Sequence, residues 1–198
     1  MCLACRMRIH MSLNKVLFIG AGGGTDVFST VLAIDDLRRA GISWGRCSVA
    51  GLLSPFHSHE GFEEVIPGFY RTGRGATATP HRRIANQAPL PDGAVARMIE
   101  GEPALGIEAA YAFDLQEGSL GISRTLRELF LRGDFDFVVI VDLGGDILGA
   151  SDRTAMSPMF EAILLRGVVD ARVPAWVYVA GLGADGEGDP RDLERAVD

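Results

Sequence analysis

The sequence has few cysteines, no long apolar run and no excess of positive charge. Three cysteines in 198 residues, at Cys2, Cys5 and Cys47, form no disulfide framework and suit a reducing compartment. No run approaches the roughly 20 apolar residues that span a bilayer, and MCLACRMRIH at the start lacks the apolar core of a signal peptide. We therefore predict a cytoplasmic protein that does not enter a membrane.

The net charge of the chain indicates which kinds of partner it is suited to bind. A formal net charge of −7 gives the chain no broad positive field. Such a chain is poorly suited to nonspecific binding of nucleic acid or of an anionic membrane surface. The sequence therefore predicts a small-molecule ligand, and it leaves a homo-oligomer open.

The length suits one domain with a sizeable core. We interpret residues 1–14 as a flexible N-terminal extension and residues 15–198 as a single α/β domain. The spacing of Cys2 and Cys5, with His10 after them, is reminiscent of a metal site. Zinc needs four ligands, however, and the other candidates are scattered, so these residues do not predict one.

Apolar runs alternate with segments of helical periodicity along most of the chain. The alternation predicts a Rossmann-like three-layer sandwich, in which a mostly parallel sheet has helices on both faces, because its strands are continuously apolar. We expect strands at 15–20, 47–53, 108–114, 137–142 and up to 181, and helices at 26–40, 93–101, 119–132, 157–169 and near the C-terminus.

Residues 54–92 are rich in Gly, Pro, His and Arg and show no clear periodicity. A span of this length predicts a binding loop or lid rather than an inert connection. Two groups of side chains in it have a functional and a plain interpretation. The segment with His57, His59 and Glu60 suits a metal or a proton shuttle, or is simply exposed. The arginines suit an anion clamp or a solvated loop; they are Arg71, Arg74, Arg82 and Arg83.

Glycine and acidic residues recur where the predicted strands end. The three segments are GAGGGTD (20–26), DLGGD (142–146) and GLGADGE (181–187), and Asp114 in FDLQEG is a weaker fourth case. Ligands of open α/β sheets bind outside the carboxyl ends of the strands, near a topological switch point. We therefore predict a binding site formed by these segments.

The first segment suits an anion, because glycines before a helix expose backbone N–H groups. The predicted cradle consists of Gly22, Gly23, Gly24 and Thr25. Asp26 offers an alternative, since its carboxylate is able to cap the same N–H groups. A dinucleotide fingerprint starting at Gly20 meets Thr25 where its last Gly belongs, and no Lys-Ser/Thr pair marks a P-loop.

The other segments supply carboxylates. Gly144 and Gly145 allow positive φ and close approach of another group to the backbone. The acids suit Mg²⁺ or the hydroxyls of a sugar, with Asp142 and Asp146 as general base or metal ligands; the others are Asp185 and Glu187. The alternative interpretation is that each acid caps a turn or a helix without meeting the others.

Four stretches together resemble one known family. They are KVLFIGAGGGTDVFST, FVVIVDLGGDILG, SPMFEAILL and GLGADGE, and the resemblance is to the family catalogued as domain of unknown function 1152, over about residues 15–190. The resemblance implies a cytoplasmic α/β protein with Gly-Asp loops and no assigned reaction. This chain has Thr25 where a fourth Gly is expected, and GASDRTAM lacks an expected Glu. It also stops soon after GLGADGE, where family members continue, which implies an incomplete site or a partner that completes it.

Three functions are consistent with these residues. The leading hypothesis is a nucleotide-like or sugar-phosphate ligand at the Gly-Asp loops, with group transfer or hydrolysis as the chemistry and Mg²⁺ as a cofactor. The second is an NAD(P)-dependent oxidoreductase. The third is a ligand sensor or an assembly subunit without catalysis.

Overall fold

The structure is a computed structural model that describes residues 13–22, 26–55, 57–80, 88–89, 91–148 and 159–183. Of residues 57, 58, 78–80, 88, 89 and 146 it describes the backbone alone. The strands are β1 (Leu13–Gly20), β2 (Trp44–Leu53), β3 (His57–Ile66), β4 (Phe69–Pro80), β5 (Ala88–Pro89), β6 (Ala110–Asp114), β7 (Phe137–Leu143) and β8 (Ala175–Ala180). The helices are α1 (Asp26–Arg39), α2 (Pro91–Gly101), α3 (Gly118–Leu131) and α4 (Met159–Ala171), with short 3-10 helices η1 (Pro103–Leu105) and η2 (Asp146–Leu148).

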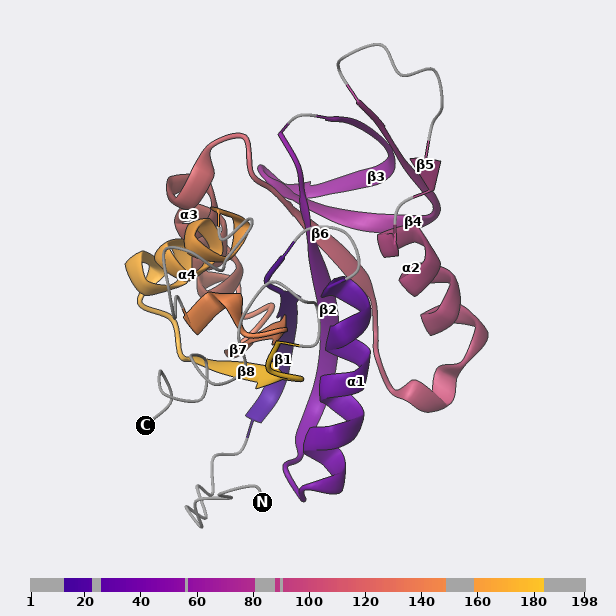
Figure 1. Ribbon diagram of the computed structural model, residues 1–198, viewed down its shortest axis with the longest axis vertical. Coiled ribbons are helices and arrows are strands. Elements are labelled where there is room, and N and C mark those ends of the chain that lie inside the picture. Colours follow the sequence, from indigo (N-terminus) through magenta and orange to yellow (C-terminus); the bar gives the residue numbers. More distant parts are fainter. Residues whose placement is uncertain are drawn as a thin grey trace.

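These strands form one mixed sheet, ordered β3-β4-β6-β2-β1-β7-β8, with β5 paired to β4 (Figure 1). Neighbours from β6 to β8 pair in parallel, whereas β3, β4 and β5 pair antiparallel and β4 joins β6 antiparallel. The predicted α/β fold with a mostly parallel sheet is thus confirmed. The strands predicted at 15–20, 47–53, 108–114 and 137–142 are all present with small shifts of their ends.

Strand β1 lies at the centre of the parallel strands. Its residues Val16 to Gly20 are apolar or small and buried, as this central place requires. It pairs with β2 on one side and with β7 on the other. The chain builds outward from β1 to β2 and β6, then returns to place β7 on the opposite side. This reversal makes the carboxyl ends of β1 and β7 the topological switch point of the sheet.

Two clusters of buried side chains line the two faces of the sheet. Val27 and Ile34 of α1 pack with Val95 of α2 against one face. Leu126 of α3 and Leu164 of α4 belong to the cluster on the other face. Figure 1 accordingly shows α1 and α2 on one side of the sheet and α3 and α4 on the other. The predicted helix stops also hold, since Gly41 and Gly133 follow α1 and α3 with φ of 83° and 71°.

The irregular structure predicted for residues 54–92 is wrong for residues 57–80. Strands β3 and β4 pair there as an antiparallel hairpin that turns at Pro67 and Gly68, where φ is 80°. Among the described side chains of β4, those of Phe69, Thr72 and Ala76 are buried. The strand is otherwise polar and rich in Gly, so few of its side chains contribute to the core. Arg82 and Arg83 lie outside the described residues. Arg74 forms an ion pair with Glu100 rather than standing free as a clamp.

The chain boundaries of the domain also shift slightly. Strand β1 begins at Leu13, which is buried, so Leu13 and Asn14 belong to the sheet and not to the predicted N-terminal extension. Cys2, Cys5 and His10, like the predicted C-terminal helix, lie outside the described residues. Among the helices that the structure does describe, none combines the length and the apolar character of a membrane span.

Candidate functional site

The glycines after β1 make room for the start of α1. A Cβ built on Gly20 would lie 2.6 Å from the backbone C and O atoms of Asp26. A Cβ built on Gly22 would overlap Oδ2 of Asp26. The helix therefore starts close above the strand end, and the Asp26 carboxylate folds back over Gly22. Gly20 and Gly22 therefore permit close approach of the helix to the main chain.

A second carboxylate reaches the same place from the other side of the sheet. The Gly22 Cβ position lies 2.8 Å from Oε1 of Glu161, a residue in the first turn of α4 that is only 5% exposed. Asp26 belongs to α1 and Glu161 to α4, and these helices pack on opposite faces of the sheet. Their carboxylates thus converge at Gly22, beside the switch point.

The end of β7 adds a third carboxylate and a turn. Asp142 is 1% exposed and lies two residues after Ile140, so strand alternation places it on the face that α3 and α4 cover. Gly144 and Gly145 follow with φ of 114° and 97°. The sequence-based prediction that this Gly pair adopts positive φ is therefore confirmed.

Backbone hydrogen bonds hold the loops side by side. The Ala21 N–H donates to the Val141 carbonyl at 2.8 Å, which ties the first loop to the end of β7. The Gly144 N–H donates to Ala180, and the Gly183 N–H donates in turn to the Gly144 carbonyl at 2.6 Å. The described first residues of all three predicted Gly-rich segments therefore meet at one edge of the sheet.

The predicted site residues divide into three groups. Gly22 and Asp26 are in contact at the end of β1, and Asp142, Gly144 and Gly145 lie at the end of the adjacent strand β7. Asp146 starts η2 at the same edge, and only its backbone is described. The remaining predicted residues, Gly23, Gly24, Thr25, Asp185 and Glu187, lie outside the described residues.

This cluster is acidic, because Asp26 and Glu161 bring two carboxyl groups to one point. Carboxylates accept hydrogen bonds from hydroxyl groups and attract a hard cation, whereas they repel a bare phosphate. Within the described residues, no group of three His, Cys, Asp or Glu side chains is arranged to hold a metal. A cation here would need the ligand itself as a further partner.

Another glycine and carboxylate meet on the neighbouring strand. Asp92, in the first turn of α2, is 4% exposed, and a Cβ on Gly51 of β2 would overlap its Oδ1. Among the described residues, this Oδ1 has no hydrogen-bond partner. Burial raises the pKa of Asp92 to about 6, although a hydrogen bond from its own backbone N–H acts in the opposite direction.

Sequence reasoning missed both Glu161 and Asp92 as members of these clusters. Each is an acid in the first turn of a helix, which is a common position because the helix dipole favours it. The available signal was that both helices start near the carboxyl edge of the sheet, where the Gly-rich loops also lie. Pairing each acid with its glycine requires the fold, because Gly22 and Glu161 are far apart in sequence.

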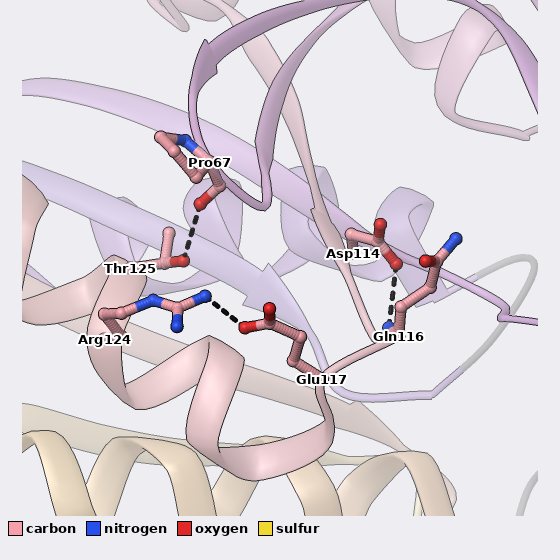
Figure 2. Close-up of polar contacts among 6 residues, drawn as sticks. All are labelled: Pro67, Asp114, Gln116, Glu117, Arg124 and Thr125. Carbon is pink, nitrogen blue, oxygen red and sulfur yellow. Dashed lines mark hydrogen bonds and ion pairs between the residues drawn. The ribbon is translucent and has the colours of Figure 1, made fainter.

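The weaker candidate, Asp114, serves a local turn. Its Oδ1 accepts a hydrogen bond from the Gln116 N–H at 2.8 Å, as Figure 2 shows. In the same view Glu117 pairs with Arg124, and the Thr125 hydroxyl donates to the Pro67 carbonyl at 3.1 Å. These residues line a hollow of about 180 Å³ beside the β3–β4 turn. Asp114 therefore caps a local turn.

One family model matches nearly the whole chain. A family model described as "Protein of unknown function (DUF1152)" matches residues 17–198. The chain belongs to this family. No curated protein matches the DUF1152 chain at a significant level. The family assignment confirms the resemblance inferred from the Gly-Asp segments, two of which form the cluster around Gly22 and the turn at Gly144.

Proposed function

We propose that this DUF1152 protein binds a nucleotide-like or sugar-phosphate molecule at the carboxyl ends of β1 and β7. The observation that carries the proposal is the convergence of Asp26 and Glu161 on Gly22. Two carboxylates at one point suit the hydroxyls of a sugar, because each oxygen accepts a hydrogen bond. The setting matches the proposal, since open α/β sheets bind ligands at their switch point.

The same charge determines how a phosphate would be held. Near Asp26 and Glu161 a phosphate would be repelled unless a cation lay between them. Mg²⁺ commonly binds through one or two carboxylates and the oxygens of a substrate phosphate. In this proposal Asp142 and Asp146 supply such carboxylates, the N–H groups of residues 22–25 cradle the anion, and Asp185 and Glu187 orient hydroxyls.

The chemistry that this arrangement supports is group transfer or hydrolysis. A carboxylate beside a bound phosphate or glycosidic centre is able to take a proton from the attacking hydroxyl or water. We assign that role to Asp142 or Asp146. A cytoplasmic location, where such ligands are abundant, is part of the proposal.

The strand order supports a Rossmann-like interpretation of the sheet. From β6 to β8 the parallel strands follow the order 3-2-1-4-5 of a dinucleotide-binding sheet. This order also favours our second candidate, an NAD(P)-dependent oxidoreductase. Against it, the fingerprint that starts at Gly20 has Thr25 where its last Gly belongs.

Thermal stability in the presence of ligands tests the proposal. The panel contains nucleotides, sugar phosphates and nicotinamide cofactors, each with and without Mg²⁺. A ligand at a hundred times its dissociation constant adds about 2.7 kcal/mol to the free energy of unfolding. We expect one phosphorylated compound to stabilise the protein, with a larger effect in Mg²⁺.

The controls are substitutions within the chain. Replacing Asp142 and Asp146 by Asn is expected to remove the Mg²⁺-dependent part of the stabilisation. Glu102→Gln, an exposed acid after α2, serves as the matched control and is expected to change nothing. Unchanged ligand binding and turnover in the Asp142 and Asp146 variants would contradict the roles given to these residues.

A further inference from the structure

Arg172 ends helix α4 in a backbone conformation that suits glycine. Its φ is 58°, and among the described residues it is the one non-glycine residue with positive φ. Its N–H donates to the carbonyls of Val168 and Val169 at 3.2 Å. Gly133 follows α3 with a similar φ of 71°. A side chain in this conformation lowers stability relative to glycine, and such strain is found most often at functional sites.

Arg172 also lines a hollow of about 890 Å³ between α3 and α4, a volume typical of small-molecule sites. The two helices lie side by side in Figure 1 and are in contact at Gly167. A Cβ at Gly167 would lie 2.5 Å from Cγ2 of Ile122, and both residues are buried. The core therefore fixes the spacing of the helices that form the walls of the hollow.

The lining of this hollow is positive, although the whole chain carries −7. Its charged residues are Arg124, Arg127, Arg172 and Asp170. The Asp170 carboxylate is already paired with Arg166 at 2.8 Å. Arg127 donates to the backbone carbonyl of Asp170, which carries no net charge. The guanidinium of Arg127 is therefore held in place and keeps further N–H donors for a ligand.

Arg124 is the third positive group of the hollow, and it pairs with Glu117, as Figure 2 shows. Both side chains are more than half exposed. An ion pair with this exposure contributes little to stability, because water screens it. Arg124 is thus able to turn from Glu117 to an anion in the hollow at little cost.

We propose that this hollow binds an organic phosphate, with the phosphate group on Arg127 and Arg172. A guanidinium donates two parallel hydrogen bonds to phosphate oxygens, so arginines suit this group better than a smaller anion. The apolar part of the ligand lies against Leu120 and Val169, which line the hollow and are 76% and 63% exposed. The buried Ser123 lines it as well, and its hydroxyl donates a further hydrogen bond.

This site is separate from the one proposed at Gly22 and does not rest on it. Gly22 follows the carboxyl end of β1, whereas Arg172 stands between α4 and the first residue of β8, at the opposite edge of the sheet. Arginines supply the positive charge here, so the phosphate needs no Mg²⁺. Binding at the two places is therefore distinguished by removal of Mg²⁺ and by substitution.

Calorimetric titration in EDTA tests this inference, with phenyl phosphate, inorganic phosphate and phenol as probes. We expect phenyl phosphate to bind, inorganic phosphate to bind more weakly and phenol not to bind. Arg172→Gly is expected to weaken phenyl phosphate binding about tenfold, because it removes charge-assisted hydrogen bonds. The same variant is expected to raise the urea midpoint, because glycine adopts positive φ without strain. Weaker binding in a more stable protein excludes misfolding as the cause.

Two further variants complete the test. Arg127→Gln is expected to weaken phenyl phosphate binding about tenfold as well. Arg39→Gln is the matched control, since Arg39 is an exposed, paired arginine of α1 on the other face of the sheet, and its binding is expected to equal that of the wild type.

Three results would overturn the proposal. The first is a wild type that binds no probe, in which case Arg172 only ends α4. The second is binding that survives both Arg172→Gly and Arg127→Gln. The third is binding that requires Mg²⁺ and disappears in Glu161→Gln, which would place the phosphate at Gly22 and support the proposed function instead.

Discussion

Two glycines near the carboxyl edge of the sheet, Gly22 and Gly51, both give space to a carboxylate, with different surroundings. At Gly22 two carboxylates meet, and their helices come from opposite faces of the sheet. At Gly51 a single carboxylate, from Asp92, is enclosed under the start of α2. Both places bury negative charge. Only the first lies at the switch point, where a ligand or cation is able to compensate it.

Under the proposed function, this difference separates the ligand site from a place where burial only lowers stability. An enclosed carboxyl that lacks a partner for one oxygen destabilises the charged form, which is why the pKa of Asp92 is raised. The cluster at Gly22 has loops with positive φ and several polar backbone groups beside it. We therefore expect substitutions at Gly51 and Asp92 to change stability, and substitutions at Gly22 to change binding.

The largest expected effect is that of Gly51→Ala. The new Cβ would overlap Oδ1 of Asp92, which is buried and has little room to move. Overpacking of this kind lowers the free energy of unfolding by about 3 kcal/mol. Urea denaturation measures the loss. Gly75→Ala is the matched strand control, because a Cβ at Gly75 meets no atom within 4 Å, and it is expected to be near neutral.

The next effect is that of Asp92→Asn, and it depends on pH. The folded protein holds the Asp92 proton up to a pKa of about 6, above the ordinary 3.8, so wild-type stability falls as pH rises through this window. The Asn variant does not titrate. It is expected to match the wild type in acid and to exceed it at neutral pH by up to about 3 kcal/mol. A stability difference that is the same at acid and neutral pH would contradict the assignment.

The smallest effect on stability is expected for Gly22→Ala. The atoms that its Cβ meets are the ends of the Asp26 and Glu161 side chains, which are able to turn aside at a cost of about 1 kcal/mol. That displacement would separate the two carboxylates. We expect the ligand-dependent rise in melting temperature to disappear, while urea denaturation without ligand stays close to the wild type. The reverse pattern would place the ligand elsewhere.

The parts of the fold that local sequence determines were predictable. The runs KVLFIG and FVVIVD form enclosed strands because every position except Lys15 and Asp142 is apolar or small, and Gly41 and Gly133 end helices because they adopt positive φ. The hairpin of β3 and β4 was not predicted. Its Gly, His and Arg content is typical of a loop. This composition led to the loop prediction, although Pro67-Gly68 is a turn signal that is also found in hairpins.

The candidate site shows the same limit. The Gly-Asp segments marked its place, because glycine and acid after an apolar strand is a local pattern. Its partner Glu161 was not identifiable, since a first-turn acid has the same sequence signature whether it caps a helix or faces a ligand. The raised pKa of Asp92 likewise depends on burial of the first turn of α2 against β2, which only the assembled fold provides.

The most direct test of the account uses Glu161→Gln and Asp92→Asn in one experiment. The rise in melting temperature caused by the best compound of the ligand panel is measured for both variants and for the wild type. The account predicts that Glu161→Gln loses most of the rise, whereas Asp92→Asn keeps it in full. A rise that survives Glu161→Gln and disappears in Asp92→Asn would contradict the placement of the site at Gly22.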